Sequence, residues 1–308
     1  MQTSNTPHDI PAPQSALRHT MRRHPLLFFF AMSYVFSWAV SVPYVLSSWG
    51  VLSGTFTTLF ILKPFAGPTL AAIVMTLILE GRDGLSQLRQ RLRWRGGSLV
   101  WSLVILVAVP VMILVGLLVQ PGILASFQGL DARAMVAYPV YFIVVLFGVA
   151  LPEEIGWRGF ALPRMQRRYG PLWGTVVLGV LWAFWHALYF LTPDHGGGPG
   201  VRLATTITNF ALFLPLVICL AIVFTWVFNH THGSIFMANL LHAAIDTPQL
   251  VWIPFFVAVD ETKLDLANLL VFGAAALLIV VLTHGRLGYQ GPESRPQTTE
   301  PKTRPNSP

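Results

Sequence analysis

The chain has 308 residues, of which 54% are hydrophobic and only 11% are charged. A soluble domain carries about 25% charged residues, so a water-soluble globular protein is excluded. The formal net charge is +7, but the basic residues lie beside apolar segments, which favours lipid headgroups and excludes nucleic acid as the partner. The single cysteine, Cys219, allows no internal disulfide.

Long apolar segments predict the fold class. Several windows of about 20 residues carry little or no charge, the length needed to cross roughly 30 Å of hydrocarbon. Backbone groups in lipid must be paired within their own segment, which favours helices over a barrel. We therefore predict an all-α polytopic transmembrane helical bundle of about eight membrane helices. The expected segments are 25–47, 56–79, 98–119, 135–157, 172–191, 205–229, 233–256 and 264–284.

Composition divides the chain into five predicted regions. A basic segment at 82–95 is either a short amphipathic helix on the membrane surface or a plain basic loop. The regions are a disordered cytoplasmic tail at 1–24, N-terminal membrane helices with the basic segment at 25–134, a central core at 135–255, a final membrane helix at 256–288 and a disordered tail at 289–308.

Basic residues alternate from loop to loop. The loop near 50–54 has no Lys or Arg, the 82–95 connection has five Arg, and the turn after the fourth segment carries Arg164, Arg167 and Arg168. By the positive-inside rule both termini are expected in the cytoplasm. The Arg-, Ala-, Gly- and Pro-rich composition is typical of a bacterial protein, so the expected location is a bacterial plasma (inner) membrane.

The first polar cluster inside an apolar segment is Glu153, Glu154 and Arg158. An ionisable residue in a membrane helix is costly and suggests a function. Glu154 and Arg158 are spaced i,i+4 and can form an ion pair, whereas Glu153 points about 100° away and is free for chemistry. The alternative is that the cluster simply marks the cytoplasmic end of the helix.

Two further polar positions lie in later segments, at His186 and at His242 with Asp246 one helical turn on. Taken alone, His186 is better explained as a structural residue, and His242 with Asp246 is equally well explained as a helix-packing polar pair. Glu153 lies 17 residues before Gly170 and His186 lies 16 after it. In an antiparallel helical hairpin the two therefore reach a similar depth, and His242 can reach the same layer.

This combination suits the activation of water. A Glu serves as base, the His residues polarise water or bind Zn²⁺, and a remaining group stabilises the oxyanion. A His and a carboxylate one turn apart can ligate a metal, or the acid can orient the ring. The residues leave both routes open. The candidate zinc ligands are Glu153, His186, His242 and Asp246.

The three motifs together resemble a known family. Glu-Glu-x-x-x-Arg, an aromatic-x-x-x-His and His-x-x-x-Asn/Asp, each on a separate membrane helix, are similar to the CPBP family of type II CAAX prenyl endopeptidases and bacteriocin-processing and immunity proteins. The resemblance covers roughly 135–255. It implies an intramembrane metallo-endopeptidase whose catalytic residues are Glu153, Glu154, Arg158, His186, His242 and Asp246.

Two positions depart from the family pattern. Trp182 stands where the family usually has Phe, which is a mild change, and Asp246 stands where Asn is common. The implied substrate is a membrane-associated protein or peptide, including prenylated CAAX proteins. Two other functions stay open, a non-catalytic membrane immunity or scaffold protein and an ion-coupled transporter. The sequence carries no information on the oligomeric state.

Overall fold

The computed structural model describes residues 16–94, 99–129, 131–193, 197–256, 259 and 261–291. Most of this part of the chain is helical, and its β-pairing is confined to a single antiparallel bridge between Phe127 and Phe256. The α-helices are α1 (Ala16–Arg23), α2 (Pro25–Ser48), α3 (Thr57–Ile61), α4 (Leu70–Gln90), α5 (Leu99–Leu118), α6 (Ala132–Val145), α7 (Leu151–Glu154), α8 (Leu162–Tyr169), α9 (Pro171–Trp185), α10 (Leu203–His230), α11 (Ile235–Trp252) and α12 (Glu261–Leu282). The π-helices are η1 (Phe65–Thr69), η4 (Leu146–Ala150) and η5 (Ile155–Ala161), and the 3-10 helices are η3 (Ile123–Ser126), η6 (Ala187–Leu191) and η8 (Ile253–Phe255).

The prediction of a helical membrane bundle is confirmed. Seven helices in the described residues are long and apolar enough to cross a membrane, one fewer than expected. The predicted segment without a counterpart among these seven, 233–256, does form a helix, α11. It falls short as a membrane span by composition because Asn239, His242 and Asp246 interrupt its apolar sequence.

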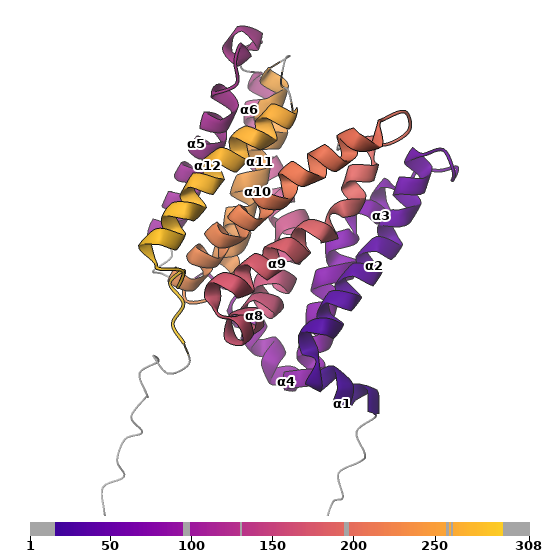
Figure 1. The fold of residues 1–308 in the computed structure, drawn as a ribbon, viewed down its shortest axis with the longest axis vertical. Helices are drawn as coiled ribbons and strands as arrows, with labels where there is room; N and C mark the ends of the chain where they lie inside the picture. The colour runs from indigo at the N-terminus through magenta and orange to yellow at the C-terminus, as the bar shows by residue number, and fades with distance from the viewer. Residues whose placement is uncertain are drawn as a thin grey trace, which may run out of the picture.

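Figure 1 shows how the helices gather. Helices α5, α6, α11 and α12 lie on one side of the bundle, α2 and α3 lie on the other, and α9 and α10 run between them. Helix α1 and the C-terminal end of α12 lie at the same end of the bundle, together with α8 and the end of α4 (Figure 1). The described arginines of the predicted cytoplasmic loops therefore lie at one end of the molecule. Both ends of the described chain lie there too.

The helix that carries Glu153 is one long segment, 132–169, interrupted by π-helical turns. Short α7 lies between η4 and η5, so both Glu residues lie between two widened turns. Pro152 contributes to this because it lacks a backbone N–H and cannot complete the regular helix ladder. Its carbonyl accepts a hydrogen bond from Thr69 Oγ1 at 2.6 Å. Widened turns of this kind are frequent at functional sites.

Small residues let η1 approach its neighbours closely. Ser33, Ser37 and Ser41 form a buried stripe on α2, and a Cβ added at Gly67 would lie 2.5 Å from the Ser33 carbonyl oxygen. On the other side, a Cβ added at Gly156 in η5 would lie 2.8 Å from backbone atoms of Pro68. This close packing brings the chain around residue 63 against the Glu-bearing helix.

The basic segment predicted at 82–95 is helical over much of its length. Helix α4 continues to Gln90 across a kink at Gly81, where φ is +67°. Beyond it, Arg91 donates to the carbonyls of Gly233, Gly159 and Arg158, each at 3.0 Å. Burial lowers the pKa of Arg91 to about 10, so the guanidinium is charged at neutral pH. Arg91 thus ties α4 to η5 and to the start of α11.

The predicted tails lie largely outside the described residues. Residues 1–15 and 292–308 are not described, whereas Ala16–Arg23 of the expected N-terminal tail form α1. The chain between α12 and residue 291 belongs to the described part and includes Leu287, which is buried against α10 and α12.

Candidate active site

Glu154 lies at the centre of a fully buried polar cluster. Arg158 Nη1 donates to its Oε1 at 2.8 Å, the i,i+4 pair predicted from the sequence. His242 Nδ1 lies 2.8 Å from the same oxygen. Arg158 is further enclosed by the rings of Trp182 and Phe224, with its Cζ 4.3 and 3.9 Å from their centroids. Oε1 of Glu154 is therefore held on both sides, by Arg158 and by His242.

Glu153 faces a different set of groups, as its position one residue earlier on the helix predicts. Its Oε2 accepts hydrogen bonds from Trp182 Nε1 at 2.8 Å and from Trp157 Nε1 at 3.3 Å. Its Oε1 lies 3.9 Å from His186 Nε2. Glu153 is 1% exposed. One carboxylate oxygen is therefore anchored by indoles, and the other faces the first histidine.

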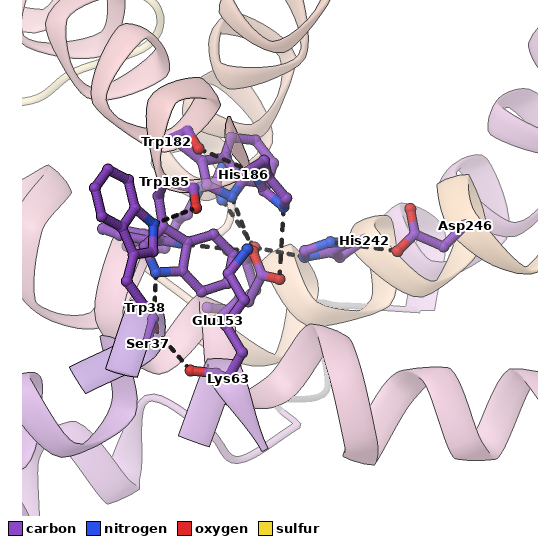
Figure 2. Close-up of polar contacts among 12 residues, drawn as sticks. Ser37, Trp38, Lys63, Glu153, Trp182, Trp185, His186, His242 and Asp246 are labelled. Carbon is purple, nitrogen blue, oxygen red and sulfur yellow. Dashed lines mark hydrogen bonds and ion pairs between the residues drawn. The ribbon is translucent and has the colours of Figure 1, made fainter. Parts of the chain in front are cut away.

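The two histidines are turned so that each presents its Nε2 atom to the site. His186 Nδ1 lies 2.9 Å from the Trp182 carbonyl oxygen, which can only accept, so Nδ1 carries the hydrogen. The contact of His242 Nδ1 with Glu154 has the same consequence. His242 Nε2 lies 3.5 Å from Asp246 Oδ2. Figure 2 shows Glu153 between the two rings, with Asp246 on the far side of His242.

These groups border a cavity of about 140 Å³. Four helical segments contribute to its wall, and most of that wall is apolar. The lining residues are Val149, Glu153, Trp182, His186, Tyr189, Phe213, Val217, Leu220, Phe224, His242, Ile245 and Asp246. All four predicted metal ligands are among them, whereas Glu154 and Arg158 support the site from behind.

A larger cavity, of about 260 Å³, lies between α2, α8 and α9. Its ionisable lining residues are His24, Arg168 and Tyr169, and it has no carboxylate among its lining residues. It therefore lacks a base for hydrolysis. The chemistry places the candidate active site in the smaller cavity.

The candidate zinc ligands meet one requirement of a metal site and fail another. Each His donates its Nδ1 hydrogen to an oxygen and presents Nε2, the arrangement that metal-ligating histidines adopt. However, the described residues contain no group of three or more His, Cys, Asp or Glu gathered closely enough to hold one ion. The side chains as they lie do not fit a zinc centre, so zinc stays a prediction and the chemistry derived below uses no ion.

Two features of the site were missed by sequence reasoning. The substitution of Trp for Phe at 182 was predicted to be mild, but the indole supplies the shortest hydrogen bond to Glu153. The second feature is Lys63, which is buried beside Trp185 and Tyr189. Its signal was present in the sequence, because Lys63 is an isolated charge within the predicted membrane segment 56–79, and such residues suggest a function.

Comparison with known proteins shows a similarity over the region that carries the motifs. Residues 135–248 match the family described as Rce1-like, type II CAAX prenyl endopeptidase Rce1-like. That range contains all three motifs. Residues 135–248, a little over a third of the chain, are thus similar to the Rce1-like family. The resemblance inferred from the motifs is confirmed, and with seven apolar helices the chain is an integral membrane protein.

A curated protein that this chain resembles is the CAAX prenyl protease 2 of Methanococcus maripaludis. The two are 26% identical over 181 residues, which is 57% of this chain and 64% of the relative. The match thus spans slightly less than two thirds of that protein's length.

Proposed function

We propose that this protein is an intramembrane endopeptidase in which Glu153 activates a water molecule. The observation that carries the proposal is the pairing of the buried Glu153 carboxylate with His186, 3.9 Å apart at the edge of a cavity inside the helical bundle. One water molecule can hydrogen-bond to both groups across a separation of this size. Neutral His186 carries its hydrogen on Nδ1, so its Nε2 can accept a hydrogen bond from that water.

In the proposed reaction the water oxygen attacks the carbonyl carbon of the scissile peptide bond. Glu153 takes one proton of the water as the C–O bond forms, acting as a general base. The negative charge passes to the carbonyl oxygen, and then the C–N bond breaks. Glu153 returns the proton to the departing amine, so the products are a new carboxylic acid and a new amine.

His242 is the proposed group that faces the oxyanion. Its ring is fixed by Glu154 through Nδ1, and Glu154 is fixed in turn by Arg158. When Nε2 is protonated it donates to the developing oxyanion, an effect that is strong in a site with little water. Asp246, 3.5 Å from that Nε2, favours the charged ring. The side chain of Asp246 is 34% exposed, far more than Glu153 or Glu154.

The proposed substrate is a membrane-associated protein or peptide, including prenylated CAAX proteins. Support comes from the apolar wall of the cavity, with Phe213, Val217 and Leu220 on α10, and from the name of the curated relative. An extended peptide near the membrane can place apolar side chains against this wall. Membrane lipids are the expected surroundings of the bundle.

The test is cleavage of a synthetic farnesylated CAAX peptide by purified wild-type protein in detergent. The same peptide without the farnesyl group serves as the matched control. We expect cleavage of the lipidated peptide and a loss of at least about 100-fold in His186→Ala. Equal cleavage by wild type and His186→Ala, both folded, would contradict the proposal.

Metal content of the same samples decides the zinc prediction. One zinc per wild-type chain that is lost in His186→Ala would support a metalloprotease. Cleavage by wild-type protein that contains no bound metal would support the route without an ion.

A further inference from the structure

Lys63 is a buried cation that none of the three motifs includes. It lies between α3 and η1 and has no exposed surface. Its Nζ is 3.7 Å from the ring centroids of both Trp185 and Tyr189. Within the described part of the chain this nitrogen has no hydrogen-bond partner. Figure 2 shows the side chain reaching from its backbone toward the group that contains Glu153 and His186.

The position of Lys63 is fixed from two sides. Its carbonyl accepts a hydrogen bond from Ser37 Oγ at 2.8 Å, and the same oxygen of Ser37 accepts from Trp185 Nε1 at 2.8 Å. Trp185 and Tyr189 in turn contact His186, with ring centroids 4.7 and 5.2 Å away. Lys63 therefore supports the wall of aromatic rings behind the histidine.

The buried acids near Lys63 indicate which negative charge its ammonium group can balance. Burial of an ammonium group without a hydrogen-bond acceptor costs free energy. Contacts with two aromatic rings offset only part of that cost. Among the buried acids nearby, Glu154 is already paired with Arg158. The hydrogen-bond donors to Glu153 are neutral indoles. The Lys63 side chain reaches toward this carboxylate in Figure 2.

We propose that Lys63 is a positioning residue of the site, whose buried ammonium balances the charge of the Glu153 carboxylate and holds Trp185 and Tyr189 against His186. It does not line the cavity, so it acts through these neighbours and not on the substrate. The predicted effect of Lys63 on catalysis rests on the proposed function. The charge balance between Lys63 and Glu153 is independent of that function and has a test of its own.

The first test is a double-mutant cycle on thermal unfolding, with Lys63→Met, Glu153→Gln and the double variant purified in detergent. Lys63→Met is expected to lower the melting temperature by roughly 5 °C or more in the wild-type background. In the Glu153→Gln background the same substitution should cost less than half as much, because no unbalanced carboxylate is left behind. Lys263→Met, at an exposed lysine near the start of α12, is the matched control and should lower the melting temperature much less than Lys63→Met, because its side chain is not buried.

The second test is kinetic. Lys63→Met is expected to lower kcat about 10- to 100-fold while KM changes by less than about threefold, because binding of the peptide is not disturbed. Lys63→Arg keeps the charge and should recover part of that loss.

Two results would overturn the proposal. One is equal destabilisation by Lys63→Met in both backgrounds, which would make Lys63 a packing residue only. The other is a folded Lys63→Met variant with unchanged kcat. If wild-type protein cleaves no peptide, the proposed function fails, and the thermal cycle still decides whether Lys63 balances Glu153.

Discussion

Two neighbouring glutamates have different partners because a helix turns about 100° per residue. Glu154 meets Arg158 and His242 and has both directions of its Oε1 occupied. Glu153 meets two indole N–H groups on one oxygen and faces His186 with the other. The difference lies in the partners and not in the side chain. A pair of identical acids can therefore supply one rigid support and one base.

The hydrogen bond from Trp182 to Glu153 predicts a measurable effect. Trp182→Phe removes the donor at 2.8 Å but keeps an aromatic ring, and a hydrogen bond to a charged group is worth about 1.5–3 kcal/mol. We expect kcat to fall roughly 10- to 100-fold. Trp157→Phe, which removes the longer contact of 3.3 Å, is the matched variant and should have a smaller effect. A larger loss in Trp157→Phe would show that the shorter contact is not the important one.

Sequence reasoning predicted the residues of the site better than the contacts between them. Residue counts on either side of Gly170 were sufficient to place Glu153 and His186 at one depth, because the chain reverses there with φ of +77°. The bond from Trp182 and the position of Lys63 depend on how helices distant in the sequence pack together. No spacing within one helix contains that information.

At the scale of elements, the close contact of η5 with η1 holds the Glu-bearing helix in place. Gly156→Ala would put a Cβ 2.8 Å from the Pro68 backbone, and overpacking of this kind costs about 1–3 kcal/mol. We expect a lower melting temperature and reduced cleavage. Gly148→Ala, in η4 with no atom within 4 Å of the added Cβ, is the control. An equal melting temperature for both variants would contradict the close approach.

Arg91 provides a second test at this scale. It joins the carbonyls of Arg158, Gly159 and Gly233, so it links the two helices that carry Glu154 and His242. Arg91→Met leaves three buried carbonyls without this donor, and we expect destabilisation of about 2–4 kcal/mol. Arg89→Met, at an exposed position in the same helix, should change unfolding by less than about 0.5 kcal/mol. Similar losses in both would mean that Arg91 does not clamp these elements.

The helices were largely predictable, and their irregularities were not. Apolar length identified α5, α10 and α12 because lipid requires about 20 such residues. The π-helical turns around α7 depend on contacts with η1 and on prolines within a continuous apolar sequence. Neither feature changes the hydropathy pattern, so the turns could not be predicted from it. Helix α11 was predicted as a membrane helix, but most of its side chains are buried inside the bundle.

For the whole molecule, both described ends of the chain and the arginine-bearing α8 lie at one end of the bundle (Figure 1). We predict that this end faces the cytoplasm. In a Cys219→Ala background, an impermeant maleimide added to intact cells should label Ser53→Cys. It should label Arg167→Cys and Gln290→Cys only after permeabilisation. Labelling of Arg167→Cys in intact cells would reverse the predicted orientation.

The central claim is that Glu153 activates the water that cleaves the peptide bond. Its most direct test is the rate of cleavage of the farnesylated peptide by Glu153→Gln compared with wild type, at matched amounts of folded protein. The substitution keeps the size of the side chain and removes the base, and general base catalysis contributes about 10²- to 10⁴-fold. We predict a loss in that range, with KM nearly unchanged. A folded Glu153→Gln variant that cleaves at the wild-type rate would contradict the account.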